Sequence, residues 1–324
     1  MMLRLVYFII VCVVTLFMVF LSIRYTDRKN QIHTRKNINP NNLGLEDIDY
    51  KFSSNEHNFS YLISESEACQ DEHIFLLVIV CVSPANSEQR QTIRETWGSV
   101  AEYDPSIKIM FLLGNPQNLT IQTQVIVESV QYHDIIQEDF IDSYRNLSIK
   151  SVALLRWVSQ FCNDAEYVLK TDDDMFIHIR NLISILKNKN PTNAVIGKRI
   201  NGAMPLRDEK SKWFTSVKEY SKRYYPPYCS GTAYVLSGDS VEPLYNVTQR
   251  VALFWLEDIY ITGICRTIAK VDIIDFQEFT YLKRDPTACS YKTAVSGHRY
   301  SVSEIRQIWT DVQNNVPCPT SGKS

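Results

Sequence analysis

Three consecutive carboxylates, Asp172, Asp173 and Asp174, form the first candidate for a chemical site in the chain. They follow residues 167–169, a short apolar run that favours β-structure, so they are expected where a buried strand reaches its carboxyl end. In open α/β sheets that edge is where ligands bind. Adjacent like charges repel one another, and a divalent cation held by oxygen ligands would offset that repulsion and neutralise a diphosphate. A solvated acidic turn explains the triplet alone equally well.

A second acidic pair, Glu257 and Asp258, lies in an otherwise apolar run between Phe254 and Ile259. Desolvation in such surroundings raises the pKa of a carboxyl group. A carboxylate with a raised pKa can take a proton from a hydroxyl group near neutral pH, which is the task of a general base. The alternative is a carboxylate at the start of a helix, stabilised by the helix dipole.

The apolar runs predict alternating strands and helices that bring these carboxylates to the edge of a sheet. Residues 74–82 are typical of a strand buried on both faces, and residues 87–97 follow as a helix with Ser87 as its expected N-cap. The alternation predicts an α/β domain with a mostly parallel sheet flanked by helices on both faces. The other expected strands are 107–113, 134–136, 167–169, 195–196 and 232–236, and the other expected helices are 121–130, 147–161 and 181–187.

Residues 201–212 form a polar loop with three basic residues, and loops of that kind often close over ligands. Lys212, Trp213 and Tyr228 are candidate ligand-binding residues near this loop, because an aromatic face can pack against an apolar face of a ligand. Burial in the core is the alternative explanation for the two aromatic residues.

Composition fits a globular protein with appendages and argues against nucleic-acid binding. The chain has 324 residues, of which 45% are hydrophobic and 22% charged, and its formal net charge is -2. It contains no strongly basic stretch of the kind that binds a phosphate backbone.

Residues 5–23 are uncharged and apolar, close to the ~20 residues that a bilayer helix needs. A cleaved signal peptide has a shorter apolar region, so the stretch predicts a signal anchor. We therefore expect a cytoplasmic tail at 1–4, a transmembrane anchor at 5–23, a largely unstructured polar stem at 24–66 and a catalytic domain at 67–324.

The orientation of the anchor is indicated by two opposed patterns. More basic residues follow the span than precede it, which favours a cytoplasmic body. Glycosylation sequons at Asn58, Asn118, Asn146 and Asn246 are usable only if the body lies in the secretory lumen.

Seven cysteines lie outside the predicted anchor, and none forms a C-x-x-C pair. This argues against a structural zinc site and predicts disulfide bonds in an oxidising lumen. An odd number leaves at least one cysteine unpaired or in an intermolecular bond, and the pairing is open.

Four runs resemble the inverting beta-1,3-galactosyltransferase and beta-1,3-N-acetylglucosaminyltransferase family, type II Golgi membrane enzymes. They are RQTIRETWG (90–98), KTDDD (170–174), YPPYCSG (225–231) and WLEDIY (255–260), in the family's order and at family-like spacing. The resemblance covers most of residues 74–317. It implies a GT-A-like nucleotide-diphospho-sugar transferase fold behind an N-terminal transmembrane helix, with the catalytic domain in the Golgi lumen.

Two of these runs indicate one donor sugar, and a further run, at 261–263, indicates another. YPPYCSG and WLED look most like the galactosyl branch, which implies UDP-galactose. The run ITG at 261–263 has one residue more before its glycine than most galactosyl members, and it is closer to the N-acetylglucosaminyl branch.

The resemblance also implies roles for the acidic residues. The family's metal-binding motif falls on Asp172, Asp173 and Asp174, with Asp174 as the direct ligand of Mn²⁺ and Asp172 beside it. The family's catalytic base falls on Asp258 of the Glu257–Asp258 pair.

The resemblance implies further site residues. Lys212, Trp213 and Tyr228 are candidates for lining the sugar subsites, because an aromatic face suits the apolar face of a pyranose. His298 matches the region in which related enzymes place a second metal ligand, and His178 is a competing candidate. Arg90 and Arg94 belong to the first α/β unit, whose loop should face the nucleotide. Arg94 and the nearby Trp97 have core packing as an alternative.

Together these residues predict transfer of galactose from UDP-galactose to the 3-hydroxyl of a sugar on a glycoprotein or glycolipid. In a single in-line displacement the base activates the hydroxyl, and the metal takes up charge on the leaving UDP. One alternative is transfer of N-acetylglucosamine or N-acetylgalactosamine. A second is a catalytically inactive lumenal sugar-binding protein, and a third is a metal-dependent phosphohydrolase.

Overall fold

The computed structural model describes residues 57–314 and 316–318, all of them within the unit that begins at Lys51. The predicted tail, the anchor at 5–23 and most of the predicted stem lie outside the described residues. No helix within the described ranges is both long and apolar enough to cross a membrane.

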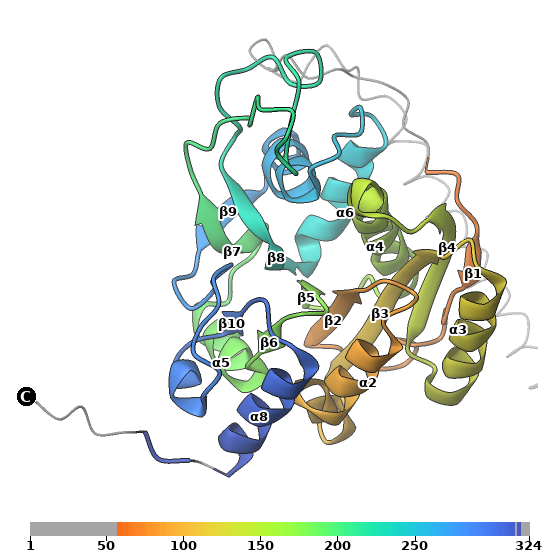
Figure 1. Cartoon of the computed structure of the whole chain (residues 1–324), viewed down its shortest axis with the longest axis vertical. Coiled ribbons are helices and arrows are strands. Elements are labelled where there is room, and N and C mark those ends of the chain that lie inside the picture. The colour runs from red at the N-terminus through yellow and green to blue at the C-terminus, as the bar shows by residue number, and fades with distance from the viewer. Residues whose placement is uncertain (1–56, 315, 319–324) are drawn as a thin grey trace, which may run out of the picture. The chain divides into compact units, whose positions relative to one another are not determined.

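An eight-stranded mixed sheet forms the centre of the fold, in the order β1-β4-β3-β2-β5-β8-β7-β9 (Figure 1). A two-stranded sheet, β6 with β10, lies beside it. The strands are β1 Tyr61–Ile63, β2 Leu76–Cys81, β3 Ile107–Asn115, β4 Ile135–Ile141, β5 Tyr167–Asp172, β6 Phe176–Ile177, β7 Ala194–Ile200, β8 Tyr228–Ser237, β9 Asp272–Asp275 and β10 Ser296–Gly297.

The α/β architecture is as predicted, and the sheet is mixed: four of its seven neighbouring strand pairs are parallel and three are antiparallel. Strands β4, β3, β2 and β5 are parallel neighbours, whereas β8 runs antiparallel to both β5 and β7. The chain reaches β8 from β7 through residues 201–227 with no helix between, so it enters the sheet in the opposite direction. Parallel neighbours need a crossover connection, usually a helix, and this connection has none.

Helices cover the sheet, and α4 matches the predicted helix at residues 147–161. Asn86, rather than the predicted Ser87, occupies the N-cap position of α2. Its side chain makes no capping hydrogen bond, because the amide instead donates to Asp173. The helices are α2 Ser87–Glu95, α3 Leu119–Tyr132, α4 Leu147–Phe161, α5 Ile179–Lys189, α6 Gly238–Thr248, α7 Arg266–Ala269 and α8 Val302–Gln313, with short turns η3 Trp97–Glu102, η4 Tyr144–Asn146 and η6 Ala288–Tyr291 and a π-helix, η5 Ile259–Cys265.

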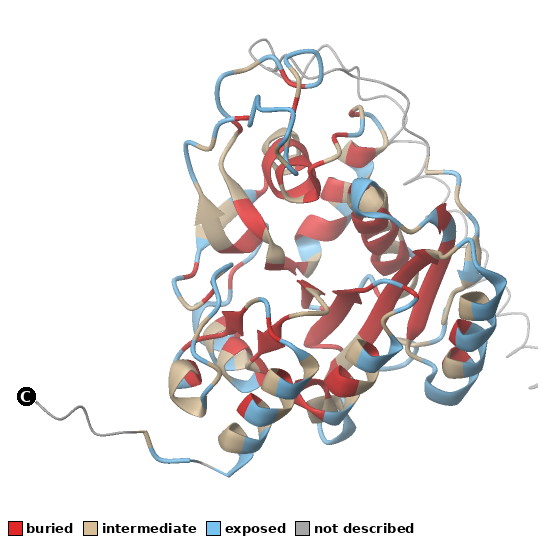
Figure 2. Ribbon diagram, viewed as in Figure 1, coloured by how far each residue is buried: buried red, intermediate tan, exposed pale blue. Residues whose placement is uncertain are grey.

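Burial is concentrated in the central strands, which Figure 2 shows in red. Every residue of β2 is buried, as the continuous apolar run predicts for a strand covered on both faces. Helix α4 packs against α6, and α2 packs against α8. The central strands are therefore a rigid base for whatever lies at their carboxyl ends.

The folded unit begins earlier than the sequence indicates. Strand β1 pairs with β4, the indole N–H of Trp157 donates to the carbonyl of Ser64, and Arg156 donates to the carbonyl of Phe59. The predicted boundary between stem and catalytic domain, at residue 66, therefore falls inside the folded unit. A three-residue strand between polar residues gives too weak a pattern to be recognised in the sequence.

Two disulfides are present in the described part of the chain, Cys69–Cys162 and Cys289–Cys318. Cys81, Cys229 and Cys265 are buried free thiols. The first disulfide joins the segment before β2 to the end of α4, across a sequence separation of 93 residues. It therefore closes a long loop in the unfolded chain.

Replacing either partner of this disulfide is expected to lower the stability of the protein substantially. Loss of the loop closure should cost about 4 kcal/mol, because the unfolded chain regains conformational entropy. Denaturant unfolding of Cys69→Ser, Cys162→Ser and the double variant measures the effect. All three variants should lose the same amount, and a double variant that loses the sum of the two singles would contradict a shared bond.

Candidate active site

The acidic triplet lies at the carboxyl end of β5, as the sequence predicts. The strand ends at Asp172, whose register partner on the parallel strand β2 is Cys81. Two backbone contacts fix the following turn. The indole of Trp97 donates to the carbonyl of Met175 over 3.1 Å, and the amide of Tyr300 donates to the carbonyl of Asp174 over 3.0 Å. Trp97 is thus a core residue that positions the triplet, which was one of its two predicted roles.

Lys170 is a buried cation at the centre of the site. Its ammonium group donates to a carboxylate oxygen of Asp172 over 2.7 Å and to the carbonyl of Gly231 over 2.5 Å. It also lies 3.7 Å from a carboxylate oxygen of Glu257. Burial opposes its charge, but Asp172 and Glu257 outweigh that effect and raise the pKa of Lys170. Burial raises the pKa of Asp172 to about 6, and Lys170 opposes that rise.

The three carboxylates of the triplet have three different partners. Asp172 faces Lys170, and Asp173 accepts a hydrogen bond from the amide of Asn86 over 2.7 Å. Asp174 lies 3.2 Å from Nε2 of His298. Burial raises the pKa of Asp173, against the effect of the Asn86 hydrogen bond. The repulsion expected between adjacent carboxylates is thus relieved by turning each to a separate partner.

Asp174 and His298 form the pair that fits a metal ion. Nδ1 of His298 donates to the carbonyl of Tyr281 over 3.0 Å, which leaves the lone pair of Nε2 directed at Asp174 in the neutral imidazole. A backbone carbonyl that orients a histidine in this way is common at metal sites. Burial lowers the pKa of His298, but its hydrogen bond with Asp174 outweighs that effect and raises it.

The small sheet explains why a residue so distant in sequence reaches the triplet. Strand β10 ends immediately before His298, and it pairs with β6, which begins two residues after Asp174. The competing candidate His178 accepts a hydrogen bond from the amide of Asn181 and caps α5. In the described ranges, no three side chains of histidine, cysteine, aspartate or glutamate gather as a metal cluster.

Glu257 is fully occupied by structural contacts. One carboxylate oxygen accepts from the hydroxyl groups of Tyr234 and Ser151, over 2.7 and 2.9 Å, and the other lies near Lys170. The side chain is buried. These contacts hold the carboxylate in place, which favours a positioning role for Glu257 over a direct part in proton transfer.

Asp258 is half-buried and differs from its neighbour. Its carboxylate accepts from the amide of Ile259 over 2.9 Å and from the amide of Gly231 over 3.3 Å. Burial raises its pKa to about 7, and the charge of Glu257 adds to the rise. Asp258 caps the start of η5. It is therefore both a carboxylate at the start of a helix and a carboxylate with a raised pKa, the two alternatives that the sequence offered.

Gly231 is required where the two halves of the site meet. A Cβ atom at this position would lie 2.9 Å from a carboxylate oxygen of Glu257 and 3.1 Å from the Cβ of Asp258. Its carbonyl accepts from Lys170 and its amide donates to Asp258. One backbone unit therefore connects the cation beside the triplet to the second acidic residue.

The predicted extra residue before Gly263 falls within the π-helix η5. A π-turn accommodates a single inserted residue within a helix, and such turns often lie at functional sites. The hydroxyl of Thr262 donates to the carbonyl of Asp258 over 2.6 Å and accepts from the amide of Cys229 over 2.9 Å. The inserted turn thus fastens the start of η5 to β8.

Arg90 and Arg94, predicted to face a nucleotide, make ion pairs and hydrogen bonds within the first part of the fold. Arg90 is buried and donates to Glu128 and to two carbonyl groups of the loop after β2. Arg94 pairs with Glu128 and Asp134. Both guanidinium groups are committed to holding α2 and the loop in place. The sequence could not show this, because their carboxylate partners, Glu128 and Asp134, lie 34 residues or more further along the chain.

The predicted sugar-binding residues divide into two places. Tyr228 is half-buried, and burial followed by the charge of Asp258 raises its pKa, which places it close to that carboxylate. Trp213 donates from its indole to the hydroxyl of Tyr144 over 3.0 Å. The ammonium of Lys212 lies 4.0 Å from the centre of the Tyr144 ring.

Sequence reasoning missed Lys170, Tyr144 and Arg145 as site residues. Arg145 lies 3.8 Å from the centre of the Trp255 ring, and Trp255 precedes the acidic pair. A usable signal existed for Lys170, because an ionisable residue inside an otherwise apolar strand must have a buried partner. Tyr144 and Arg145 carry no such signal, since they look like any exposed turn.

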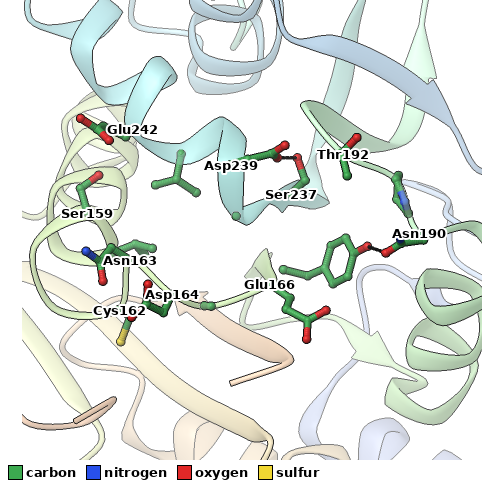
Figure 3. A pocket seen from close by; sticks show the side chains of 16 residues that line it. Ser159, Cys162, Asn163, Asp164, Glu166, Asn190, Thr192, Ser237, Asp239 and Glu242 are labelled. Atoms are coloured by element: carbon green, nitrogen blue, oxygen red, sulfur yellow. Dashed lines mark hydrogen bonds between the residues drawn. The ribbon is translucent and has the colours of Figure 1, made fainter. Parts of the chain in front are cut away.

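A cavity of about 690 Å³ lies at the opposite edge of the sheet (Figure 3). Its lining includes Glu166 at the amino end of β5 and Asp239 at the start of α6. None of the predicted site residues lines it. The cavity is therefore separate from the cluster around the acidic triplet.

The amino-acid sequence matches the galactosyltransferase family model over residues 88–277. The chain belongs to this family. Mouse and human beta-1,3-galactosyltransferase 1 are each 38% identical to it over 300 residues, covering 90% of this chain and 89% of theirs. Human beta-1,3-galactosyltransferase 2 is 36% identical over 271 residues, covering 81% of this chain and 64% of its own. The predicted family is confirmed, and the protein is a hexosyltransferase.

Solved structures resemble the chain more distantly. The galactosyltransferase LgtC, in complex with donor and acceptor sugar analogues, shares 10% sequence identity with a TM-score of 0.39, covering 76% of this chain and 98% of that one. The family assignment rests on the sequence matches.

Removing the buried cation of the site is expected to destabilise the fold. Lys170→Met should cost about 3 kcal/mol, because it leaves Asp172 and Glu257 as buried carboxylates without a counter-charge. Urea unfolding measures the loss, and adding Asp172→Asn and Glu257→Gln should recover part of it.

The matched control is Lys283→Met, which removes the cation of an exposed pair with Glu304. This substitution should change stability by less than about 1 kcal/mol. Equal losses for the two lysine variants would contradict the central place of Lys170.

Proposed function

We propose that the protein transfers galactose from UDP-galactose to the 3-hydroxyl of an acceptor sugar on a glycoprotein or glycolipid, inverting the anomeric centre. The observation that carries the proposal is Asp258, a half-buried carboxylate with a pKa of about 7, joined through Gly231 and Lys170 to the acidic triplet. The relatives named beta-1,3-galactosyltransferases support both the sugar and the linkage.

Asp258 is assigned the role of general base. Its raised pKa lets the carboxylate bind a proton from the acceptor hydroxyl near neutral pH, and the amides of Gly231 and Ile259 hold it in place. The deprotonated hydroxyl attacks the anomeric carbon as UDP leaves from the opposite face. One displacement converts the α-linked donor to a β-linked product.

Asp174 and His298 are assigned the metal site. Their carboxylate oxygen and imidazole nitrogen suit Mn²⁺, and two protein ligands leave positions for the oxygens of a diphosphate. The ion would supply positive charge that stabilises the leaving UDP. Lys170 is assigned a positioning role, because its ammonium faces Asp172 on one side and Glu257 on the other.

Transfer of N-acetylglucosamine or N-acetylgalactosamine is the second candidate. The observation that favours it is the π-helix η5, which contains the extra residue at 261–263 that resembles the N-acetylglucosaminyl branch. A sugar-binding protein without turnover is the candidate from a different class, and it predicts UDP binding without transfer.

A Golgi location with a lumenal catalytic domain, anchored by residues 5–23 as a single-pass type II protein, is part of the proposal. Two disulfides in the folded unit support it, because disulfides persist in oxidising compartments.

The proposed function is tested by transfer assays with the full-length purified protein. We expect Mn²⁺-dependent transfer from UDP-galactose, loss of transfer with a chelator, and weaker Mn²⁺ binding by calorimetry in Asp174→Ala. Activity only with an N-acetylhexosamine donor would select the second candidate. Binding of UDP without transfer from any donor to mixed glycan acceptors would favour the sugar-binding protein.

The dependence of activity on pH tests the assigned base. Because Asp258 must be ionised to accept a proton and its pKa is about 7, kcat/KM should rise with pH and level off above that value. Asp258→Asn should lower kcat by at least about a hundredfold. A variant that keeps both its rate and its pH profile would refute the assignment.

Thermal unfolding separates loss of the base from loss of the fold. The pKa of Asp258 is higher in the folded protein than its ordinary value of about 4, so ionisation costs stability as pH rises from about 4 to about 7. Asp258→Asn removes that cost. At pH 8 the variant should therefore unfold at a temperature no lower than that of the native protein.

A further inference from the structure

Residues 201–224 cover the side of the site that carries Trp255 and Asp258. The ring of Tyr220 packs 5.7 Å from that of Phe254, and Tyr225, which follows the segment, packs 6.0 Å from the same ring. The segment forms green loops at the top of Figure 1, and Figure 2 shows most of it exposed. It therefore borders the assigned base on one side and solvent on the other.

Positive charge is concentrated in this segment. Six cations stand against three anions there, in a chain whose formal net charge is -2. Apart from the adjacent Lys222 and Arg223, the cations are separated along the segment, so they do not form a long basic run in the sequence. They are Arg207, Lys210, Lys212, Lys218, Lys222 and Arg223, and the anions are Asp208, Glu209 and Glu219.

The exposed cations nearest the site are Arg145 and Lys212, and one carboxylate, Glu219, lies within electrostatic range of Arg145. Hydrogen bonds from Ser216 lower the pKa of Glu219, and the charge of Arg145 adds to that effect. In the described part of the chain, neither Lys212 nor Arg145 forms an ion pair, although both are exposed. Elsewhere in the fold cations such as Lys150 and Arg94 are paired. A group of unpaired like charges beside a ligand site raises the local positive potential and attracts an anion.

Aromatic rings lie directly against these two cations. Arg145 stacks on Trp255, and Lys212 stacks on Tyr144, whose hydroxyl accepts from Trp213. A stacked guanidinium keeps its N–H edges free to bind a carboxylate or sulfate, often through two hydrogen bonds. The rings themselves offer apolar faces to a pyranose. These three contacts bring recognition of a sugar ring and of an anionic group to one place.

We infer that the acceptor is an anionic glycan, carrying a carboxylate or sulfate close to the attacked hydroxyl, and that Arg145 and Lys212 bind this group. The inference rests on the proposed function. The donor diphosphate is assigned to the other side of the site, at Asp174 and His298. The cations beside Trp255 and Tyr144 are therefore left for the acceptor.

Matched pairs of acceptors test this inference in the full-length protein. The pairs are a β-linked N-acetylglucosaminide with and without a 6-sulfate, and a β-glucuronide beside its methyl ester. At low salt we expect kcat/KM to be at least about tenfold higher for the anionic member of a pair. The preference should shrink as salt rises, because ions screen exposed charges.

The double variant Arg145→Gln, Lys212→Gln should bring the ratio of anionic to neutral kcat/KM close to one. The control is Arg180→Gln with Lys187→Gln, which removes the same charge from α5, far from residues 201–224 (Figure 1). The control should keep the native ratio. A ratio near one in the native protein, or a ratio unchanged in the double variant, would overturn the inference.

Binding of the same acceptors, measured by saturation-transfer NMR with UDP and Mn²⁺ present, decides the question without turnover. Preferential binding of the anionic member, lost in the double variant, supports the inference even if transfer fails. Efficient transfer to neutral acceptors without any preference would remove the inference and leave the proposed function standing. Binding of anionic phospholipid vesicles by this surface, with no acceptor preference, would assign the charge to a membrane instead.

Discussion

The site depends on the buried ammonium group of Lys170. Buried carboxylates are costly unless a counter-charge lies within hydrogen-bond range, and here Asp172 and Glu257 share one cation. The pairing of β5 with β8 brings Gly231 to the same ammonium. Because Gly231 in turn donates to Asp258, the position of that carboxylate follows from where the cation lies.

The reversed strand β8 is what makes this arrangement possible. A parallel strand beside β5 would place its own carboxyl end next to the triplet, whereas antiparallel β8 begins there. Residues near the start of β8 can then bind both Lys170 and the helix that follows Asp258. A short hairpin would be enough to join the antiparallel strands β7 and β8. The chain instead connects them through residues 201–227, and this long connection carries the exposed cations of residues 201–224.

The sequence predicted the strands and helices whose formation depends on the burial of their own residues. The continuous apolar run of β2, the helical spacing of α4 and the strand before Asp172 were all visible, because burial on one or both faces leaves a periodic trace. The direction of β8 was not visible, because the pattern of apolar residues that indicates a strand does not show whether it pairs parallel or antiparallel to its neighbours. Arg90 was assigned to the nucleotide because a sequence shows that a residue is charged but not that a residue such as Glu128 pairs with it in the fold.

The position of Asp258 at the start of a π-helix joins two features that the sequence presented separately. The acidic pair and the extra residue before Gly263 looked like a catalytic signal and a mark of a neighbouring family branch. In the fold the extra residue lets Thr262 donate to the carbonyl of Asp258 while it accepts from the amide of Cys229. An ordinary α-turn would shift every later residue of the helix by one position. Thr262 therefore links the backbone of Asp258 to the start of β8, so the π-helix and the acidic residue belong to one packed unit.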